Sequence, residues 1–490
     1  MNPMKKMKHP IYLLLISILS IAFLTYCSDD ENNTVVPKTE LNPNEEEEEN
    51  ESSIDGDVLM INNFIKENME IYYFWNEELP DIDQEKEEDS EEYFYKLLKD
   101  PEDRWSFITD DYPALVKYFS GIEKSTGYSL QLMYLNSTSN QVIAVIEYVH
   151  PDTPAEEAGL KRGDIIIKID GQLINDENYS DLLARTSFEI TLGEIVGGNT
   201  SDLEPTIPIQ AMEINLNPIV KTNIIDTLGH KIGYLAYTSF VFDYNDDLEA
   251  VIQEFKQAGV TDMVLDLRYN GGGSVATAEL LGSMLVPTGN AGNVFIETVY
   301  NTVVTNSLNQ DPDLPDDFFL RKFTEHESNL NLDKLYVFTT ESTASASEMI
   351  IYGLEPYMDV VQIGTQTHGK YYGSITLYDE EEKHDWAIQP IVLRSINAED
   401  NIDYTQGLIP EVVLNDYFYN YPGDLGDPEE LFMAKVISVI TGEPFIYDQS
   451  DEQSIAKSAS RQFKKAPGLR EKLYPLRNRM WVDFPEAMKP

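Results

Sequence analysis

The chain has very little cysteine, histidine or positive charge. Its 490 residues include one cysteine, Cys27, and six histidines, so no disulfide framework is expected. Lysine and arginine together number 35 against 86 aspartates and glutamates, and the formal net charge is −51. Such a chain has little with which to neutralise phosphates, which argues against nucleic acid as a partner. No His/Cys cluster has metal-ligand spacing, so we expect neither a metal nor another cofactor.

Only the N-terminus carries a signal-like apolar run. Residues 11–24 are apolar, follow three lysines and precede Cys27, which is the pattern of a secretory signal peptide. The run is short for a spanning helix, and its C-terminal flank is acidic rather than basic. A lone cysteine at this point resembles a bacterial lipoprotein site, at which Cys27 would be lipidated. The alternative is an uncleaved anchor, which the bulky Tyr26 favours. Either interpretation predicts a protein of the cell envelope, anchored to the outer membrane in the first case, with its bulk outside the cytoplasm.

Composition and periodicity predict an α/β protein with several domains. Acidic, polar composition predicts a disordered tether, and apolar spacing of three and four residues predicts helices. Repeated alternation of strand and helix predicts a largely parallel sheet. The expected segments are a signal peptide (1–27), the tether (28–57), an N-terminal helical domain (58–124) that buries Trp105 and Phe107, a domain of short strands (125–215), an α/β domain (216–415), and a helix with a basic tail (416–490).

The segment "STASASE", Ser342 to Glu348, joins an apolar strand to an apolar helix using small residues. A nucleophile at such a junction needs small neighbours, so that a substrate backbone can approach its oxygen. The start of a helix also directs backbone N–H groups at developing negative charge. The plainer alternative is a helix cap, in which Ser345 and Glu348 form a capping box and Glu348 is only a helix-start charge.

A candidate base lies in "GTQTHGKYYG", where Lys370 is flanked by glycine and tyrosine. A lysine activates a serine only when it is neutral, and a free lysine has a pKa of ~10.4, so it must be desolvated among apolar groups. Taken alone, Lys370 is more simply an ordinary lysine. His368 is a rival base, because positions two apart on a strand share a face, although a surface histidine is its simplest interpretation.

A third segment, "DLRYNGGGS", ends a strand with three glycines before a helix begins. Glycines leave backbone N–H groups bare, so that they can point at a ligand. Glycine-rich turns also bind phosphates, but no "GKS" follows and no acidic residue is placed for a ribose. A nucleotide site therefore fits poorly.

Together, "DLRYNGGG", "STASASE" and "GTQTHGK" resemble, in that order, the C-terminal processing (tail-specific) serine peptidases, over roughly residues 54–412. "PAEEAGLKRGDIIIKIDG" is similar to the PDZ domain that this family carries, and "GLIPEVVL" to a late strand motif. The resemblance implies a crotonase/ClpP-like α/β catalytic core preceded by a PDZ domain and a helical domain. It implies Ser345 as nucleophile and Lys370, 25 residues later, as general base. The oxyanion hole would use the N–H of Ala346 and of Gly272, the latter uncertain by one residue among the three glycines.

Two departures from the family pattern leave the third catalytic partner open. Members often have a glutamine four residues after the lysine, and here that residue is Ser374. An acidic residue found in some members eleven residues after the serine is Pro356 here. Ser374 is therefore a possible orienting residue for Lys370, or the core works as a dyad.

The PDZ-like segment predicts peptide binding through Gly127, Tyr128, Ser129 and Leu130. PDZ domains add a peptide strand to a sheet edge and capture its terminal carboxylate with backbone N–H groups. The expected partners are therefore proteins or peptides with exposed C-terminal tails. A spacer domain that merely packs against the core is the alternative.

The expected activity is that of an extracytoplasmic serine endopeptidase that recognises C-terminal tails and works through an acyl-enzyme. Two alternatives stay open. One is an inactive, peptide-binding scaffold lipoprotein on the same fold, which the missing glutamine favours. A remoter one is a crotonase-like enzyme acting on thioesters, since glycine-rich loops also suit their oxyanions.

Overall fold

The computed structural model describes residues 54–136, 138–196, 198–399, 404–416, 423–445, 464–465 and 480–481. All of them belong to one compact unit, Ser53–Pro490. Cys27, the predicted signal peptide and the tether up to Ser53 lie outside the described residues. Within the described ranges, no helix combines the length and the apolar character needed to cross a membrane.

Helices dominate the N-terminal part, as expected, and aspartates start them. The side chains of Asp55, Asp89 and Asp111 accept N–H bonds from the first turns of the three α-helices, as N-cap residues do. Trp105 and Phe107 are each 5% exposed, which confirms their predicted burial. The elements are α1 (Gly56–Tyr72), η1 (Asn76–Glu78), η2 (Gln84–Lys86), α2 (Ser90–Leu97), β1 (Phe107–Thr109) and α3 (Tyr112–Phe119).

This helical part shares its core with the α/β part. Ile65 and Met69 of α1 belong to the same buried cluster as Met349. Strand β1 pairs antiparallel with β21 (Ala387–Gln389). The Asn301 side-chain amide also donates to the carbonyls at the end of α1, at 2.9 and 2.8 Å. The helices are therefore built into the α/β part rather than around a core of their own.

Short strands follow, arranged around a separate hydrophobic cluster. The order of the sheet is β24-β3-β4-β5-β7-β8, where β24 is Lys464–Lys465, and β6 and β9 are attached to β5 and β7. Strands β2 and β10 pair with each other where the chain enters and leaves this region. The elements are β2 (Ile122–Ser125), β3 (Tyr128–Tyr134), β4 (Val142–Val149), α4 (Pro154–Glu157), β5 (Ile165–Ile169), β6 (Gln172–Leu173), α5 (Tyr179–Leu183), β7 (Ser187–Val196), β8 (Asn199–Asp202), β9 (Ile207–Gln210) and β10 (Met212–Asn215).

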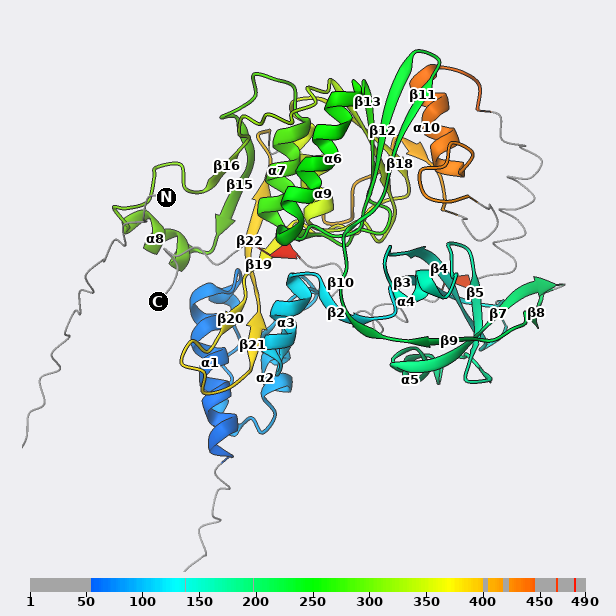
Figure 1. Ribbon diagram of the computed structural model, residues 1–490. Coiled ribbons are helices and arrows are strands. Elements are labelled where there is room, and N and C mark those ends of the chain that lie inside the picture. Colours follow the sequence, from blue (N-terminus) through cyan, green and yellow to red (C-terminus); the bar gives the residue numbers. More distant parts are fainter. Residues whose placement is uncertain are drawn as a thin grey trace, which may run out of the picture. The chain divides into compact units, whose positions relative to one another are not determined.

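The main sheet of the α/β part has the order β11-β12-β13-β17-β18-β23. All its pairings are parallel except β11 with β12, which confirms the predicted largely parallel sheet. Apolar side chains on its two faces belong to two different clusters, because helices cover both faces (Figure 1). The strands are β11 (Ile219–Thr227), β12 (His230–Tyr237), β13 (Asp262–Asp266), β17 (Lys334–Thr339), β18 (Asp359–Gly364) and β23 (Val412–Val413).

The helices of this part end and begin largely where the sequence predicts. Helix α6, for example, ends at Gly259, whose φ of 73° is left-handed. Residues of α6, α7 and α9 belong to one buried cluster of the sheet and residues of α10 to the other. The helices are η3 (Phe242–Tyr244), α6 (Asn245–Ala258), α7 (Val275–Leu285), α8 (Thr302–Gln310), α9 (Ala346–Leu354) and α10 (Leu431–Thr441).

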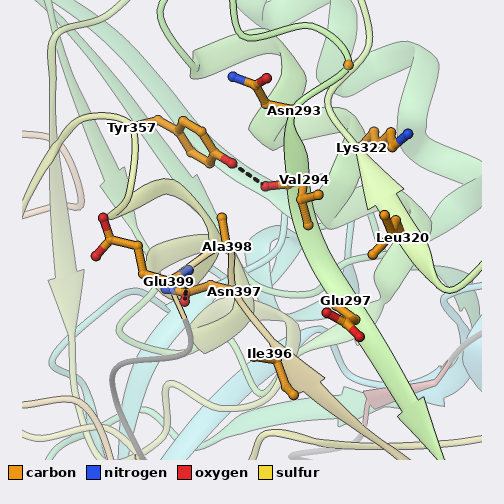
Figure 2. A pocket seen from close by; sticks show the side chains of 11 residues that line it. Asn293, Val294, Glu297, Leu320, Lys322, Tyr357, Ile396, Asn397, Ala398 and Glu399 are labelled. Carbon is orange, nitrogen blue, oxygen red and sulfur yellow. Dashed lines mark hydrogen bonds between the residues drawn. The ribbon is translucent and has the colours of Figure 1, made fainter. Parts of the chain in front are cut away.

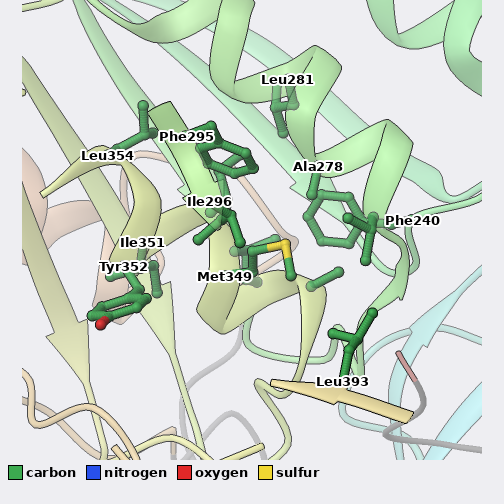
Figure 3. Packing of buried hydrophobic residues seen from close by; sticks show 14 of the residues in the cluster. Phe240, Ala278, Leu281, Phe295, Ile296, Met349, Ile351, Tyr352, Leu354 and Leu393 are labelled. Carbon is green, nitrogen blue, oxygen red and sulfur yellow. The ribbon is translucent and has the colours of Figure 1, made fainter. Parts of the chain in front are cut away.

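A second six-stranded sheet, which the sequence did not predict, has the order β14-β25-β19-β22-β15-β16. Phe295 and Ile296 of β15 pack with Ala278 and Leu281 of α7 and with Met349 of α9 (Figure 3). Helices α7 and α9 are therefore buried between two sheets. The strands, with β20 and β21 of a small third sheet, are β14 (Gly273–Ser274), β15 (Val294–Tyr300), β16 (Leu320–Lys322), β19 (Tyr372–Ser374), β20 (Leu377–Tyr378), β21 (Ala387–Gln389), β22 (Ile391–Ile396) and β25 (Met480–Trp481).

Candidate active site

Ser345 lies at the turn from strand β17 into helix α9, immediately before the helix. Its backbone has φ 66° and ψ −118°, a conformation that costs a non-glycine residue about 1–3 kcal/mol. The side chain is fully buried, and its Oγ has no hydrogen-bond partner within the part of the chain that the structure describes. A strained turn that presents an unpaired hydroxyl at a helix N-terminus is the arrangement used for nucleophilic serines.

The predicted capping box of Ser345 and Glu348 is present. Glu348 accepts a hydrogen bond from the Ser345 N–H at 2.9 Å, as the acidic member of a capping box does. The Ser345 side chain faces the N–H of Glu348 in the same capping box, although its Oγ has no hydrogen bond of normal geometry within the described residues.

Glu348 joins the backbone of Ser345 to that of Lys370. Besides Ser345, its carboxylate accepts from the N–H groups of Lys370 at 2.8 Å and Gly369 at 2.7 Å, and from the Thr367 hydroxyl at 2.5 Å. Burial raises the pKa of Glu348 to about 7, and these hydrogen bonds oppose the rise. The sequence predicted a helix-start charge here. It does lie in the first turn of α9, but it is completely buried and holds the two candidate catalytic segments together.

Lys370 lies in an irregular loop between β18 and β19, and its side chain is fully buried. The preceding Gly369 has φ 90°, and a Cβ on it would lie 2.4 Å from the carbonyl oxygen of Thr405. Only glycine fits there, and the close packing fixes the loop. His368 is half-buried and is not on a strand. The prediction that it shares a strand face with Lys370 is therefore wrong. Its N–H donates to the Thr343 carbonyl at 3.0 Å, which ties this loop to the serine loop.

The glycine-rich turn lies against the serine loop, but Gly272 has its N–H engaged. That N–H donates to Oδ1 of Asn270 at 2.8 Å. Gly273 has φ 137°, and a Cβ there would lie 2.2 Å from the carbonyl oxygen of Phe240. Ala346 is the first residue of α9, where N–H groups lack intrahelical acceptors. The oxyanion assignment of Ala346 and Gly272 stays a prediction.

Asn270 is a site residue that the sequence reasoning missed. Its carbonyl accepts from the N–H of Ala344 and the hydroxyl of Ser347, both at 3.1 Å. Its amide donates to the Tyr237 carbonyl at 2.9 Å. Asn270 thus fastens the glycine turn to the serine loop. An amide directly before three glycines was the available signal.

Ser374 is buried on β19 and has a glutamine partner from another strand. Its Oγ accepts from Nε2 of Gln389 at 3.1 Å, and Oε1 of Gln389 accepts from the Thr376 hydroxyl at 2.7 Å. Gln389 is fully buried on β21. A glutamine therefore exists next to the position where the resemblance implies one, although it comes from a distant part of the sequence. The orienting role of Ser374 stays a prediction.

Asp266 and Arg268 of the "DLRY" segment form a separate buried ionic cluster. Arg268 is bonded to Asp266 at 2.6 Å and to Glu430 at 2.8 Å, and its guanidinium lies 4.3 Å from the ring centre of Phe432. Arg162, from the region of short strands, donates to the Tyr269 hydroxyl at 2.5 Å. This cluster connects the two regions of the chain and is built from paired charges.

The predicted peptide-binding loop opens strand β3, which begins at Tyr128. Gly127 has φ 94°, and a Cβ there would lie 2.2 Å from Cβ of Thr153. Ser129 donates to Oε2 of Glu147 at 2.7 Å, Leu130 is buried, and burial raises the pKa of Tyr128 to about 12. The loop is thus a close-packed turn at the start of β3, and its role in binding peptides stays a prediction.

A pocket of about 750 Å³ lies elsewhere, between β15, β16 and the residues that follow β22 (Figure 2). Glu297, Lys322, Tyr357 and Glu399 are among its lining residues, and none of the predicted catalytic residues is. The pocket contains no candidate nucleophile with a base beside it among its lining residues, so we do not assign the catalytic reaction to it. Among the described residues, no group of three or more His, Cys, Asp or Glu side chains could hold a metal ion.

Family models match three parts of the chain. Residues 231–383, which include both Ser345 and Lys370, match peptidase family S41. Residues 60–107 match the peptidase S41 N-terminal domain, and residues 145–192 match a PDZ domain. The chain therefore contains a peptidase family S41 domain, an S41 N-terminal domain and a PDZ domain. Its S41 fold and its PDZ domain confirm the predicted α/β catalytic core with PDZ and N-terminal domains.

Among known proteins, the chain is similar to an S41 peptidase structure and to curated processing enzymes. The crystal structure of a protein from Bacteroides fragilis, assigned to the S41 proteases, matches with 28% identity and a TM-score of 0.65, over 78% of this chain and 97% of that one. The chloroplastic C-terminal processing peptidase of Tetradesmus obliquus is 25% identical over 50% of this chain and 51% of its own length. The carboxyl-terminal-processing protease of Picosynechococcus is 23% identical over 54% and 61%. The match therefore spans about half to three fifths of these two curated relatives.

Proposed function

We propose that the chain is a serine endopeptidase in which Ser345 is the nucleophile and Lys370 the general base. One observation carries the proposal. The buried Ser345 hydroxyl lacks a partner within the described residues and stands on a strained turn at a helix N-terminus. Glu348 ties the backbone of that serine to the backbone of Lys370.

The reaction follows the usual course of acyl transfer. Ser345 Oγ attacks the peptide carbonyl carbon while Lys370 Nζ takes the hydroxyl proton. The tetrahedral oxyanion is stabilised by backbone N–H groups, for which Ala346 and one of the glycines of the glycine-rich turn are the candidates. The C–N bond then breaks, the leaving amine takes the proton from Lys370, and water hydrolyses the acyl-enzyme by the same proton transfers.

Burial supports Lys370 as the base. Its side chain has no exposure to solvent. Removal from water disfavours a charged amine, and a lysine accepts a proton only in its neutral form.

The substrates that we propose are proteins and peptides with exposed C-terminal tails. The PDZ domain supports this class, because PDZ domains bind chain ends at a sheet edge. The curated relatives are themselves named as C-terminal processing enzymes. We further propose that the chain is lipid-anchored at Cys27 to the outer membrane and works outside the cytoplasm. Replacing Cys27 with serine should then release the protein from the membrane fraction, whereas retention would contradict the anchor.

The decisive test compares the chain from Ser28 onward with two variants, Ser345→Ala and Lys370→Met. The substrate is an unfolded protein with an apolar C-terminus. We expect cleavage by the unmodified chain and none by either variant, with all three binding the tail equally. If the unmodified chain binds the tail and never cuts it, the endopeptidase proposal fails and an inactive scaffold remains.

A further inference from the structure

Two residues near the C-terminus, Met480 and Trp481, form a strand inside the candidate site (Figure 1, red). This strand, β25, lies between β14 and β19 in the second sheet. It runs parallel to both, with Met480 opposite Gly273 and Trp481 opposite Ser274 and Ser374. On one side it therefore pairs with the glycine-rich turn, and on the other with the strand that follows Lys370.

An extended substrate bound at the candidate site would have to lie in this gap between β14 and β19. An extended peptide recognised by main-chain hydrogen bonds adds as a strand to exposed strand edges. Here the edge of β14 that faces away from Phe240 and the edge of β19 that faces away from β22 are both taken by β25. A substrate strand needs the same N–H and C=O groups, so it and β25 exclude each other.

A second strand from the same end of the chain pairs with the PDZ sheet. Lys464 and Lys465 form β24, which is antiparallel to β3, opposite Tyr134 and Met133. Because the pairing is antiparallel, this segment runs toward the loop that begins β3. PDZ domains accept peptides by antiparallel addition next to such a loop. Strands β24 and β25 thus pair with an edge of the PDZ sheet and with both strands of the β14–β19 gap.

Two further features favour this intramolecular docking. The ring of Trp481 stacks on Phe119 of α3, with centroids 4.2 Å apart and planes at 25°, which gives β25 a side-chain anchor. The segment is also basic in a chain whose net charge is −51, so it is drawn to the rest of the protein. Its cations are Lys464, Lys465, Arg470, Lys472, Arg477 and Arg479.

We propose that the β14–β19 gap and the edge of β3 form a binding site for extended, basic–aromatic peptide segments, and that strands β24 and β25 of this chain are its resting occupants. The protein is then held in a self-inhibited state until a substrate tail displaces its own. This inference rests on the proposed function for the identity of the cleft. The docking itself rests on the strand pairings.

Mass action gives the size of the effect. For a tethered segment with an effective concentration of about 1 mM and a Kd of about 0.1 mM, roughly one molecule in ten is open at any time. Removing the segment should then raise kcat/KM for a tail-bearing substrate about tenfold.

The first test is a matched pair of truncations of the chain from Ser28. One ends after Arg477 and lacks β25, and the other ends after Val482 and keeps it. We expect the shorter chain to cleave about tenfold faster than the full-length chain, and the longer one to behave like full length. Trp481→Ala, which keeps the full tail, should give a smaller rise. Equal rates for all four proteins, with unchanged thermal unfolding, would overturn the inhibitory role.

A binding test that needs no catalysis separates this inference from the proposed function. A fluorescent peptide of residues 474–485 is titrated, by anisotropy, into Ser345→Ala proteins with and without the tail. We expect it to bind the chain that ends after Arg477 at least tenfold more tightly than full length, and a peptide with Trp481→Ala to bind weakly. If no protein cleaves but this difference holds, the function fails and the docking stands. If the shortened chain cleaves no faster and binds no peptide, the docking fails and the function stands.

Discussion

Two buried polar clusters lie after neighbouring parallel strands, and they treat their polar groups in opposite ways. After β13, Arg268 is paired with Asp266 and Glu430 in geometry that leaves its charge matched. After β17, Ser345 has a strained backbone and a hydroxyl without a partner among the described residues. Buried polar groups are normally bonded, and the proposed function assigns the unbonded Ser345 hydroxyl to the substrate. One cluster is built from paired charges, and the other is the proposed catalytic site.

Ser345→Ala should have the largest effect on activity and almost none on stability. Removing the nucleophile should lower kcat/KM by about 10⁴-fold or more. Stability should hardly change, because the lost hydroxyl makes no hydrogen bond within the described residues. Peptidase assays and urea unfolding measure the two effects. Ser347→Ala is the matched control, since Ser347 donates to the Asn270 carbonyl at 3.1 Å. It should cost about 1 kcal/mol of stability and leave most of the activity.

Arg268→Met should lower the stability strongly and the activity per folded molecule much less. It leaves Asp266 buried without its cation and Glu430 with only Arg162, 3.7 Å away, so we expect a loss of about 3–5 kcal/mol in the free energy of unfolding. Urea denaturation measures it, and activity per folded molecule should fall far less than in Ser345→Ala. Lys334→Met removes an exposed pair with Asp359 and should cost at most about 1 kcal/mol. If the two substitutions cost the same, the Arg268 cluster is not the structural one.

Glu348→Gln should alter the pH dependence of stability. Burial raises the pKa of Glu348 to about 7 from an ordinary value of 4.5. The folded protein therefore holds this proton more tightly than the unfolded one. The contribution is fully present below pH 4.5 and is lost as the pH rises through about 7. The unfolding free energy of the parent minus that of the variant should fall by about 3 kcal/mol across this window.

Taking the difference between parent and variant removes the contribution of Glu355, a half-buried carboxyl whose pKa is also raised to about 7. Urea titrations at pH 4.5, 6 and 7.5 give the values. A difference that does not change with pH contradicts the buried position of Glu348. The variant should also lose activity about tenfold or more, because the backbones of Ser345 and Lys370 lose a shared acceptor.

Gln389→Leu should give the smallest effect of the series. It removes the donor to Ser374 and the acceptor for Thr376. If Ser374 orients Lys370, kcat should fall about three- to tenfold with KM nearly unchanged, and the pH–rate profile should shift. The control is Gln362→Leu on β18, another buried glutamine, whose Oε1 has no partner among the described residues. Equal kcat values for the two variants would assign Gln389 to packing alone.

The sequence predicted well those features that local chemistry determines. Helix α6 and strands β13, β17 and β18 follow from apolar periodicity and from the stop at Gly259. The position of Ser345 at a strand-to-helix turn followed from a run of small residues. These signals lie within a few residues of the structure that they determine.

The features that the sequence did not predict depend on contacts between distant segments. Strands β14 and β25 are two residues long and lie more than 200 positions apart, so neither has a detectable period. Gln389 reaches Ser374 from another strand, and Glu348 carries a charge in a helix turn that periodicity alone cannot identify as buried. Such pairings exist only once the sheets have formed.

Covalent labelling of Ser345 is the most direct test of the account. The chain that ends after Arg477 is treated with a fluorophosphonate probe, digested and analysed by mass spectrometry, with Ser345→Ala and Lys370→Met beside it. The proposed Ser345–Lys370 mechanism predicts a single adduct on Ser345. The adduct should be absent from Ser345→Ala and form at least about a hundredfold more slowly in Lys370→Met. An unmodified Ser345, or an adduct that forms equally fast without Lys370, would contradict it.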